Sequence, residues 1–125
     1  MIEQYFQSQL DLLASLPFVE SSNVNLEQRG ELVGFIRGEV GFSDGTILFF
    51  RELIDFRLPL QTVMYAYHYQ TGQGSLILRY DNTAHHKSIS TFPNHKHLKD
   101  GKVTASAPPT LESVLREIES IVLKK

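Results

Sequence analysis

Short turns divide the middle of this 125-residue chain into strand-like segments, and their spacing limits the fold more than any other feature. Residues 43–45 (Ser-Asp-Gly) are typical of a hairpin turn, and residues 71–74 (Thr-Gly-Gln-Gly) mark another. Strand-like segments cover 46–56, 62–70 and 75–81. Parallel strands need crossovers of roughly a dozen residues or more, and these gaps are too short for that. The spacing therefore predicts an antiparallel meander.

The preceding segment, 25–42, also alternates as a strand does, but glycines at 30, 34, 38 and 41 interrupt it. We expect a bent or bulged pair of strands there. Both ends of the chain show helical periodicity instead. The N-terminal run closes at Pro17, and the segment 109–123 carries one apolar stripe with Thr110 as its N-cap. The stripe that should pack on the sheet is Leu111, Leu115, Ile118 and Val122.

These patterns predict one α+β domain over residues 1–125. A single antiparallel sheet of about five to seven strands is flanked by an N-terminal helix and a C-terminal helix. Glu112 suits the positive end of the second helix, and Lys124 and Lys125 suit its negative end. The chain has no cysteine, no signal-peptide pattern, and no apolar run near the roughly 20 residues of a membrane span. We expect a soluble, cytoplasmic protein without disulfides and without membrane contact.

Four of the five histidines fall within thirteen residues, at His85, His86, His95 and His97. Residues 79–107 carry five basic residues and two acids, a net charge of +3 before any histidine is protonated. Histidine changes charge nearest neutral pH and serves as general acid, general base or metal ligand. Such a segment would attract an anionic ligand.

Two imidazoles beside a phosphodiester, one as base and one as acid, are sufficient for metal-free RNA cleavage. His95 and His97 are the leading pair, and we expect His86 to converge with them, with Arg79 or Lys96 steadying the developing charge. If residues 95–97 are extended, His95 and His97 share a face and Lys96 points away; in a turn, all three crowd together. Catalytic candidates are therefore His86, His95, His97 and Lys96, and substrate-binding candidates are Arg79, Asp81, His85 and Lys87.

Several alternatives remain open for these residues. The histidines with Asp81 could hold a metal, but their spacing matches no standard zinc motif, and a lysine between two ligands is unfavourable. We therefore predict no metal and no cofactor; an inert, solvated loop is a further reading. Arg79 could bind phosphate or form an ion pair with Asp81. The stripe of Tyr65, Tyr67 and Tyr69 is either core or a stacking platform, and His68 on the other face is either structural or a ligand.

The order Arg79-Tyr-Asp-Asn, His85-His and Thr91-Phe-Pro-Asn-His-Lys-His, followed by the closing helix, resembles the TumE-type toxins of bacterial toxin–antitoxin systems. The resemblance spans most of the chain. It implies an intracellular toxin that is neutralised by a cognate antitoxin, often a helix-turn-helix protein.

The preferred function is a toxin-like protein that acts on RNA as a metal-independent ribonuclease. The alternative is a non-catalytic module that uses the same basic, histidine-rich loop to bind nucleic acid or protein. A third reading is an orphan domain whose partner has diverged. We also expect a second chain, an antitoxin or another copy in a homodimer, because one apolar run is long for a small domain to cover: Phe49, Phe50, Leu53, Ile54 and Phe56.

Overall fold

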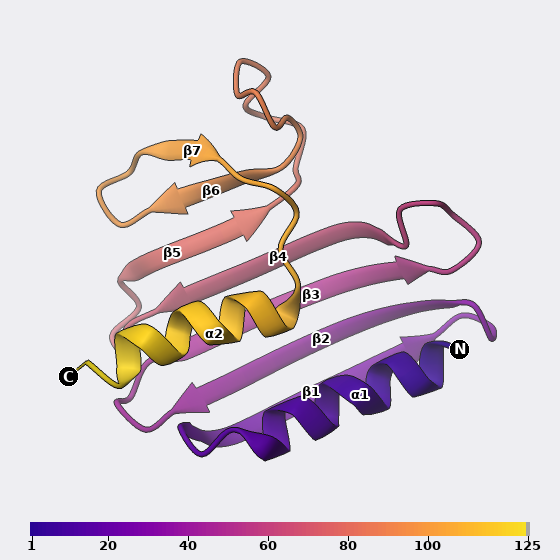
Figure 1. Cartoon of the computed structure of the whole chain (residues 1–125), viewed down its shortest axis with the longest axis horizontal. Helices are drawn as coiled ribbons and strands as arrows, with labels where there is room; N and C mark the ends of the chain where they lie inside the picture. The colour runs from indigo at the N-terminus through magenta and orange to yellow at the C-terminus, as the bar shows by residue number, and fades with distance from the viewer. Residues whose placement is uncertain (125) are drawn as a thin grey trace.

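The computed structural model describes residues 1–124 and consists of one antiparallel sheet with two helices (Figure 1). All seven strands follow one another in the sheet in chain order. The elements are α1 (Ile2–Ser15), β1 (Val19–Gln28), β2 (Val33–Phe42), β3 (Ile47–Asp55), β4 (Thr62–Gln70), β5 (Leu76–Asp81), β6 (His95–Leu98), β7 (Val103–Ala105) and α2 (Leu111–Val122). The α+β fold with an antiparallel meander and terminal helices is confirmed.

The turns form where the sequence predicts them, with Gly45 at φ +87° and Gly74 at φ +98°. Glycine suits both positions because a side chain is strained at such positive angles. The strand pair expected from residue 25 starts earlier, since β1 begins at Val19, and its bulge lies between Val19 and Ser21. β1 is a mostly exposed, polar edge strand, so its first half lacks the apolar alternation that would have revealed it.

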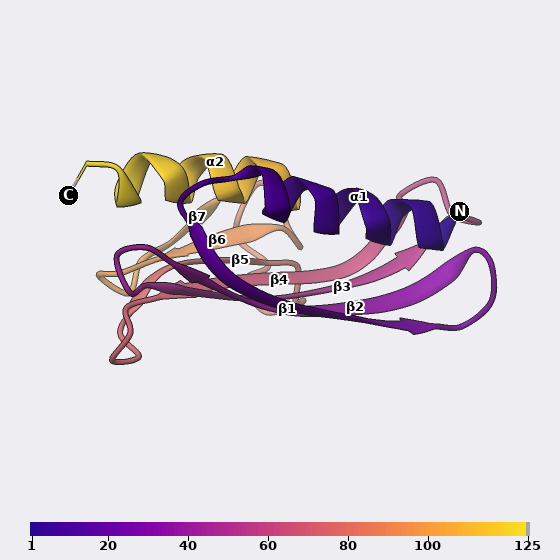
Figure 2. The same cartoon turned by 90° about the horizontal axis from the view of Figure 1, so that it is seen from below.

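Both helices cover the same face of the sheet (Figure 2). α2 starts at its Thr110 cap, whose side chain accepts a hydrogen bond from the Ser113 backbone, and Glu112 lies in its first turn. Lys124 follows the end of α2, while Lys125 lies outside the described residues. The predicted apolar stripe of α2 is buried: Leu111, Leu115, Ile118 and Val122. These residues belong to the same hydrophobic core as the buried residues of the strands.

The tyrosine stripe of β4 also faces the helices, because Tyr65, Tyr67 and Tyr69 are each at most 2% exposed. The core alternative is therefore correct, and the stacking alternative is wrong. Tyr67 donates a hydrogen bond to Glu52, a fully buried carboxylate that the sequence did not single out. Tyr5 and Gln9 of α1 donate to the same carboxylate at 2.6 and 2.7 Å, so Glu52 ties α1 to the sheet.

The opposite face of the sheet carries no helix, and we call it the open face (Figure 2). The apolar run of β3 is divided between the two faces. Phe50 and Ile54 are buried in the core, whereas Phe49 remains 38% exposed on the open face. None of the helices in residues 1–124 has the length and apolar character needed to cross a membrane.

Candidate functional site

The pairing of β5 with β6 places His95 opposite Asp81 and His97 opposite Arg79. Residues directly opposite one another in a ladder share a face, so all four side chains belong to the open face. Lys96 lies on the covered face, where its Nζ donates to Glu117 of α2 at 2.7 Å. Residues 95–97 are therefore extended, and Lys96 points away from the two histidines.

The loop between β5 and β6 folds back and adds His86 to His95 and His97. We call these three residues the histidine cluster. Their ring centroids are 4.8 Å (His86–His95), 5.6 Å (His86–His97) and 4.9 Å (His95–His97) apart, and each pair meets edge to face. Three imidazoles, from one loop and one short strand, therefore lie within contact distance of each other.

His95 forms the floor of the histidine cluster and is only 2% exposed. Its Nδ1 lies 2.9 Å from the Pro93 carbonyl oxygen; a carbonyl only accepts, so this nitrogen carries the hydrogen. Its Nε2 lies 2.8 Å from Oδ1 of Asp81, within ion-pair distance, although the geometry is not that of a hydrogen bond. Both ring nitrogens of His95 therefore face oxygen acceptors, the Pro93 carbonyl on one side and the Asp81 carboxylate on the other. His95 is thus held in place but shielded from solvent.

Asp81 links the histidine cluster to the rest of the open face. Its carboxylate accepts hydrogen bonds from Arg79 Nε at 2.9 Å and from the Thr83 hydroxyl at 2.8 Å. Burial by itself would raise the pKa of Asp81, but the hydrogen bonds from Thr83 and Arg79 outweigh it and lower the pKa. Asp81 is therefore charged at neutral pH. Sequence reasoning missed Thr83, although a Thr two residues after an Asp at a strand end is typical of an Asx turn.

His97 is the partly accessible member on β6, with 26% of its side chain exposed. Partial burial lowers its pKa below the usual 6.5, and the positive neighbours His95, Arg79 and His86 lower it further, while Asp81 acts in the opposite direction. The His97 imidazole is consequently mostly neutral at pH 7 and can accept a proton.

Arg79 extends the site toward β4. Besides its ion pair with Asp81, it donates from Nη1 to His68 Nδ1 at 3.2 Å. Burial and the charge of Arg79 lower the pKa of His68. The ion-pair alternative for Arg79 and Asp81 is therefore the one observed, and His68 is a hydrogen-bonded partner of Arg79.

Two other predicted substrate-binding residues, His85 and Lys87, are exposed in the loop. Within residues 1–124, no side-chain hydrogen bond or ion pair connects either of them to the histidine cluster. Of the eight residues singled out from the sequence, the structure brings together His86, His95, His97, Arg79 and Asp81. It leaves His85, Lys87 and Lys96 outside.

The histidine cluster is also the group that could hold a metal ion. One nitrogen from each ring lies within 4.8 Å of the others. In a closed tetrahedral zinc site, bonds of about 2.0–2.1 Å place neighbouring nitrogens about 3.4 Å apart. The rings would have to draw together to bind zinc, and Asp81 already accepts from Arg79 and Thr83.

A comparison with protein-family models matches residues 9–122 to the family described as Toxin TumE. No curated protein and no solved structure matches the chain. The match covers every strand of the sheet, the second half of α1, the whole of α2 and the complete histidine cluster.

Proposed function

The chain belongs to the TumE toxin family, and from this premise we propose that it cleaves RNA without a metal, using His97 and His86. Membership of a toxin family implies a cognate antitoxin. The observation that carries the proposal is the convergence of three imidazoles on the open face, two of them partly exposed. Their positions on β6 bring His95 and His97 together. His86 joins them only because the loop between β5 and β6 folds back.

His97 is the base in this mechanism because its lowered pKa leaves it neutral near pH 7. It removes the proton from a ribose 2′-hydroxyl, and the 2′-oxygen forms a bond to the neighbouring phosphorus. The bond from phosphorus to the 5′-oxygen breaks, and protonated His86 donates its proton to that oxygen. The products are a 2′,3′-cyclic phosphate and a free 5′-hydroxyl, and the two imidazoles have exchanged protonation states.

The sequence favoured His95 as the partner of His97, but at 2% exposure His95 cannot reach a substrate. His86 is the accessible member of the cluster that remains, and its ring centroid lies 5.6 Å from that of His97. His95 acts as a positioning residue, fixed by the Pro93 carbonyl and packed against both other rings. Arg79 is placed to stabilise charge that develops on the phosphate, because its guanidinium adjoins the cluster through Asp81.

The test compares cleavage and binding of a single-stranded RNA by the wild-type protein and by His97→Ala and His86→Ala. Each variant should lose about 10²- to 10⁴-fold in turnover while keeping RNA affinity. His85→Ala is the matched control, since His85 adjoins His86 in the chain but is exposed and outside the cluster. A wild-type protein that binds RNA or protein without any turnover would instead support the non-catalytic binding module.

A further inference from the structure

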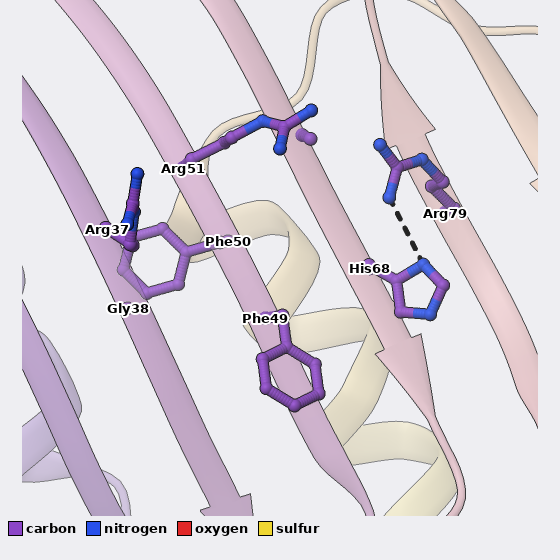
Figure 3. A pocket seen from close by; sticks show the side chains of 8 residues that line it. Arg37, Gly38, Phe49, Phe50, Arg51, His68 and Arg79 are labelled. Atoms are coloured by element: carbon purple, nitrogen blue, oxygen red, sulfur yellow. Dashed lines mark hydrogen bonds between the residues drawn. The ribbon is translucent and has the colours of Figure 1, made fainter. Parts of the chain in front are cut away.

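A shallow pocket of about 290 Å³ lies on the open face beside the histidine cluster. Its floor contains the small residues Gly38 and Ala66. The long side chains around it come from four adjacent strands (Figure 3), namely Arg37, Phe49, Arg51, His68 and Arg79. No residue that lines this pocket carries a carboxylate.

Two arginines of this pocket occupy opposite positions on neighbouring strands, and Arg37 lies over the ring of Phe35, 5.4 Å from its centroid. Arg37 on β2 is directly opposite Arg51 on β3. Both side chains are exposed, and neither forms an ion pair with any residue from 1 to 124. Like charges directly opposite one another on neighbouring strands destabilise a sheet. A bound anion would remove this repulsion, so the pair marks a place for a phosphate or a carboxylate.

The pocket also presents an aromatic surface. Phe49 on β3 is 38% exposed, while its neighbour Phe50 is buried in the core. An exposed ring among cations is what single-stranded nucleic acid needs, since bases stack on aromatic side chains and phosphates pair with arginines. An acidic side chain does lie nearby, because Glu39 is directly opposite Phe49, at the rim beyond the pocket lining.

The strand register connects the pocket to the histidine cluster. Phe49 is opposite His68, His68 is opposite Arg79, and Arg79 is opposite His97. Figure 3 shows the guanidinium of Arg79 turned toward β4, where it meets His68. Four strand spacings separate β2 from β6, or about 19 Å, which is enough for a strand of a few nucleotides to cross the face.

We propose that the open face binds a single-stranded RNA segment that crosses the strands from Arg37 to His97. Backbone phosphates lie at Arg37 and Arg51, a base stacks on Phe49, and Arg79 guides the scissile phosphate to the histidine cluster. Duplex RNA is excluded as the ligand because its stacked bases cannot reach an aromatic side chain on a flat sheet. This inference rests on the proposed function for the last step only; the binding itself does not require cleavage.

The experiment measures fluorescence anisotropy of a labelled ten-nucleotide RNA that carries 2′-O-methyl groups and so cannot be cleaved. Arg37→Gln and Arg51→Gln should each weaken binding and reduce the slope of log affinity against log salt by about 0.7, the share of one phosphate contact on a single strand. Phe49→Ala should weaken binding at least about fivefold, with little change in that slope. A duplex of the same sequence should bind markedly less well than the single strand.

Arg116→Gln is the matched control. Arg116 is an exposed arginine on α2, on the other side of the sheet, where it contacts Glu112 and Glu119. It should change neither affinity nor salt slope. Thermal unfolding of each variant separates lost binding from lost folding, and Arg51→Gln should fold at least as well as wild type because it relieves the repulsion from Arg37.

The outcomes distinguish this inference from the proposed function. If Arg51→Gln binds RNA with unchanged affinity and slope while His97→Ala abolishes cleavage, the RNA path is wrong and the catalytic proposal stands. If the open-face variants lose RNA binding but the wild-type protein never cleaves, the path stands and the ribonuclease fails. If Arg51→Gln keeps RNA affinity but loses a co-expressed antitoxin, the face binds protein and the inference is overturned.

Discussion

His97 Nε2 lies 3.3 Å from Oδ2 of Asp81, diagonally across the pair of β5 and β6. A carboxylate at this position favours the tautomer in which Nε2 carries the hydrogen and Nδ1 has the free lone pair. Asp81 is itself held by Arg79 and Thr83, so its orientation is fixed from the other side. The base of the proposed reaction is therefore oriented by a hydrogen-bonded carboxylate.

The pH dependence of cleavage should follow from this arrangement. The His97 pKa is below 6.5, so turnover should rise as pH increases through that value and His97 becomes neutral. Turnover should then level off at a plateau once His97 is fully neutral. Single-turnover rates from pH 4.5 to 8.5 check this.

Asp81→Asn provides a sharper version of the same measurement. The negative charge of Asp81 raises the His97 pKa, so its removal should move the acidic limb of the profile to lower pH. The rate on the plateau should also fall, because the tautomer preference is lost. An acidic limb that stays in place in Asp81→Asn would show that a different group limits the rate at low pH.

Stability should also depend on pH through the histidines. The pKa values of His97 and His68 are lowered in the folded chain, so the unfolded chain binds more protons near pH 6. The contribution of these two histidines to the stability of the folded chain is present above the unfolded pKa of about 6.5. It is lost as the pH falls through their lowered pKa values in the folded chain. Urea unfolding at pH 7.5 and pH 5 should show this loss, and it should be smaller in His97→Gln. An equal loss in both proteins would contradict the assignment to His97.

The buried carboxylate of Glu52 should be sensitive to loss of a donor. Tyr67→Phe removes one hydrogen bond to a fully buried charge and should lower the free energy of unfolding by about 1.5–3 kcal/mol. Tyr80→Phe is the control: its hydroxyl donates to Glu117, a partly exposed carboxylate, so its loss should cost less. Urea denaturation with unchanged m-values measures both variants. If both lose the same free energy of unfolding, burial of Glu52 does not increase the cost of removing a hydrogen-bond donor.

Removal of metal ions distinguishes acid–base catalysis by the histidine cluster from metal-ion catalysis at the same residues. Cleavage should persist after dialysis against EDTA, because neither base nor acid needs an ion. Zinc added at high concentration should inhibit if it draws the three rings together, since it would occupy the nitrogens that move protons. One tightly bound transition-metal ion per chain, required for turnover and lost in His86→Ala, would replace the metal-independent mechanism with metal-ion catalysis.

The sequence predicted the meander because its turns and apolar alternation are local signals. It also predicted that His95 and His97 share a face if residues 95–97 are extended, but it left open whether they are extended or form a turn, and it could not tell which face of the sheet they occupy, because that depends on packing. Lys96 meets Glu117 only because α2 returns across the sheet. Similarly, Glu52 lies in an apolar strand, and its partners Tyr5 and Gln9 are more than forty residues away.

The pairing of Arg37 with Arg51 could have been predicted from the sequence. The turn at 43–45 places residues equidistant from Asp44 opposite one another, as the observed register shows. The pairing of Arg37 with Arg51 follows from that symmetry, and so does the unbalanced positive charge at the centre of the open face. The burial of His95 could not be found in this way, because it depends on how the loop before β6 returns over the strand edge.

The metal-independent ribonuclease mechanism is best tested by product analysis of a defined single-stranded RNA that has been incubated with the protein in EDTA. We expect fragments that end in a 2′,3′-cyclic phosphate and begin with a 5′-hydroxyl, identified by mass spectrometry. The same mechanism requires that a single 2′-deoxy nucleotide at the cleavage position blocks the reaction, and that His97→Ala yields at least about 100-fold less product. Fragments with a 5′-phosphate, or cleavage that survives the 2′-deoxy substitution, would contradict it.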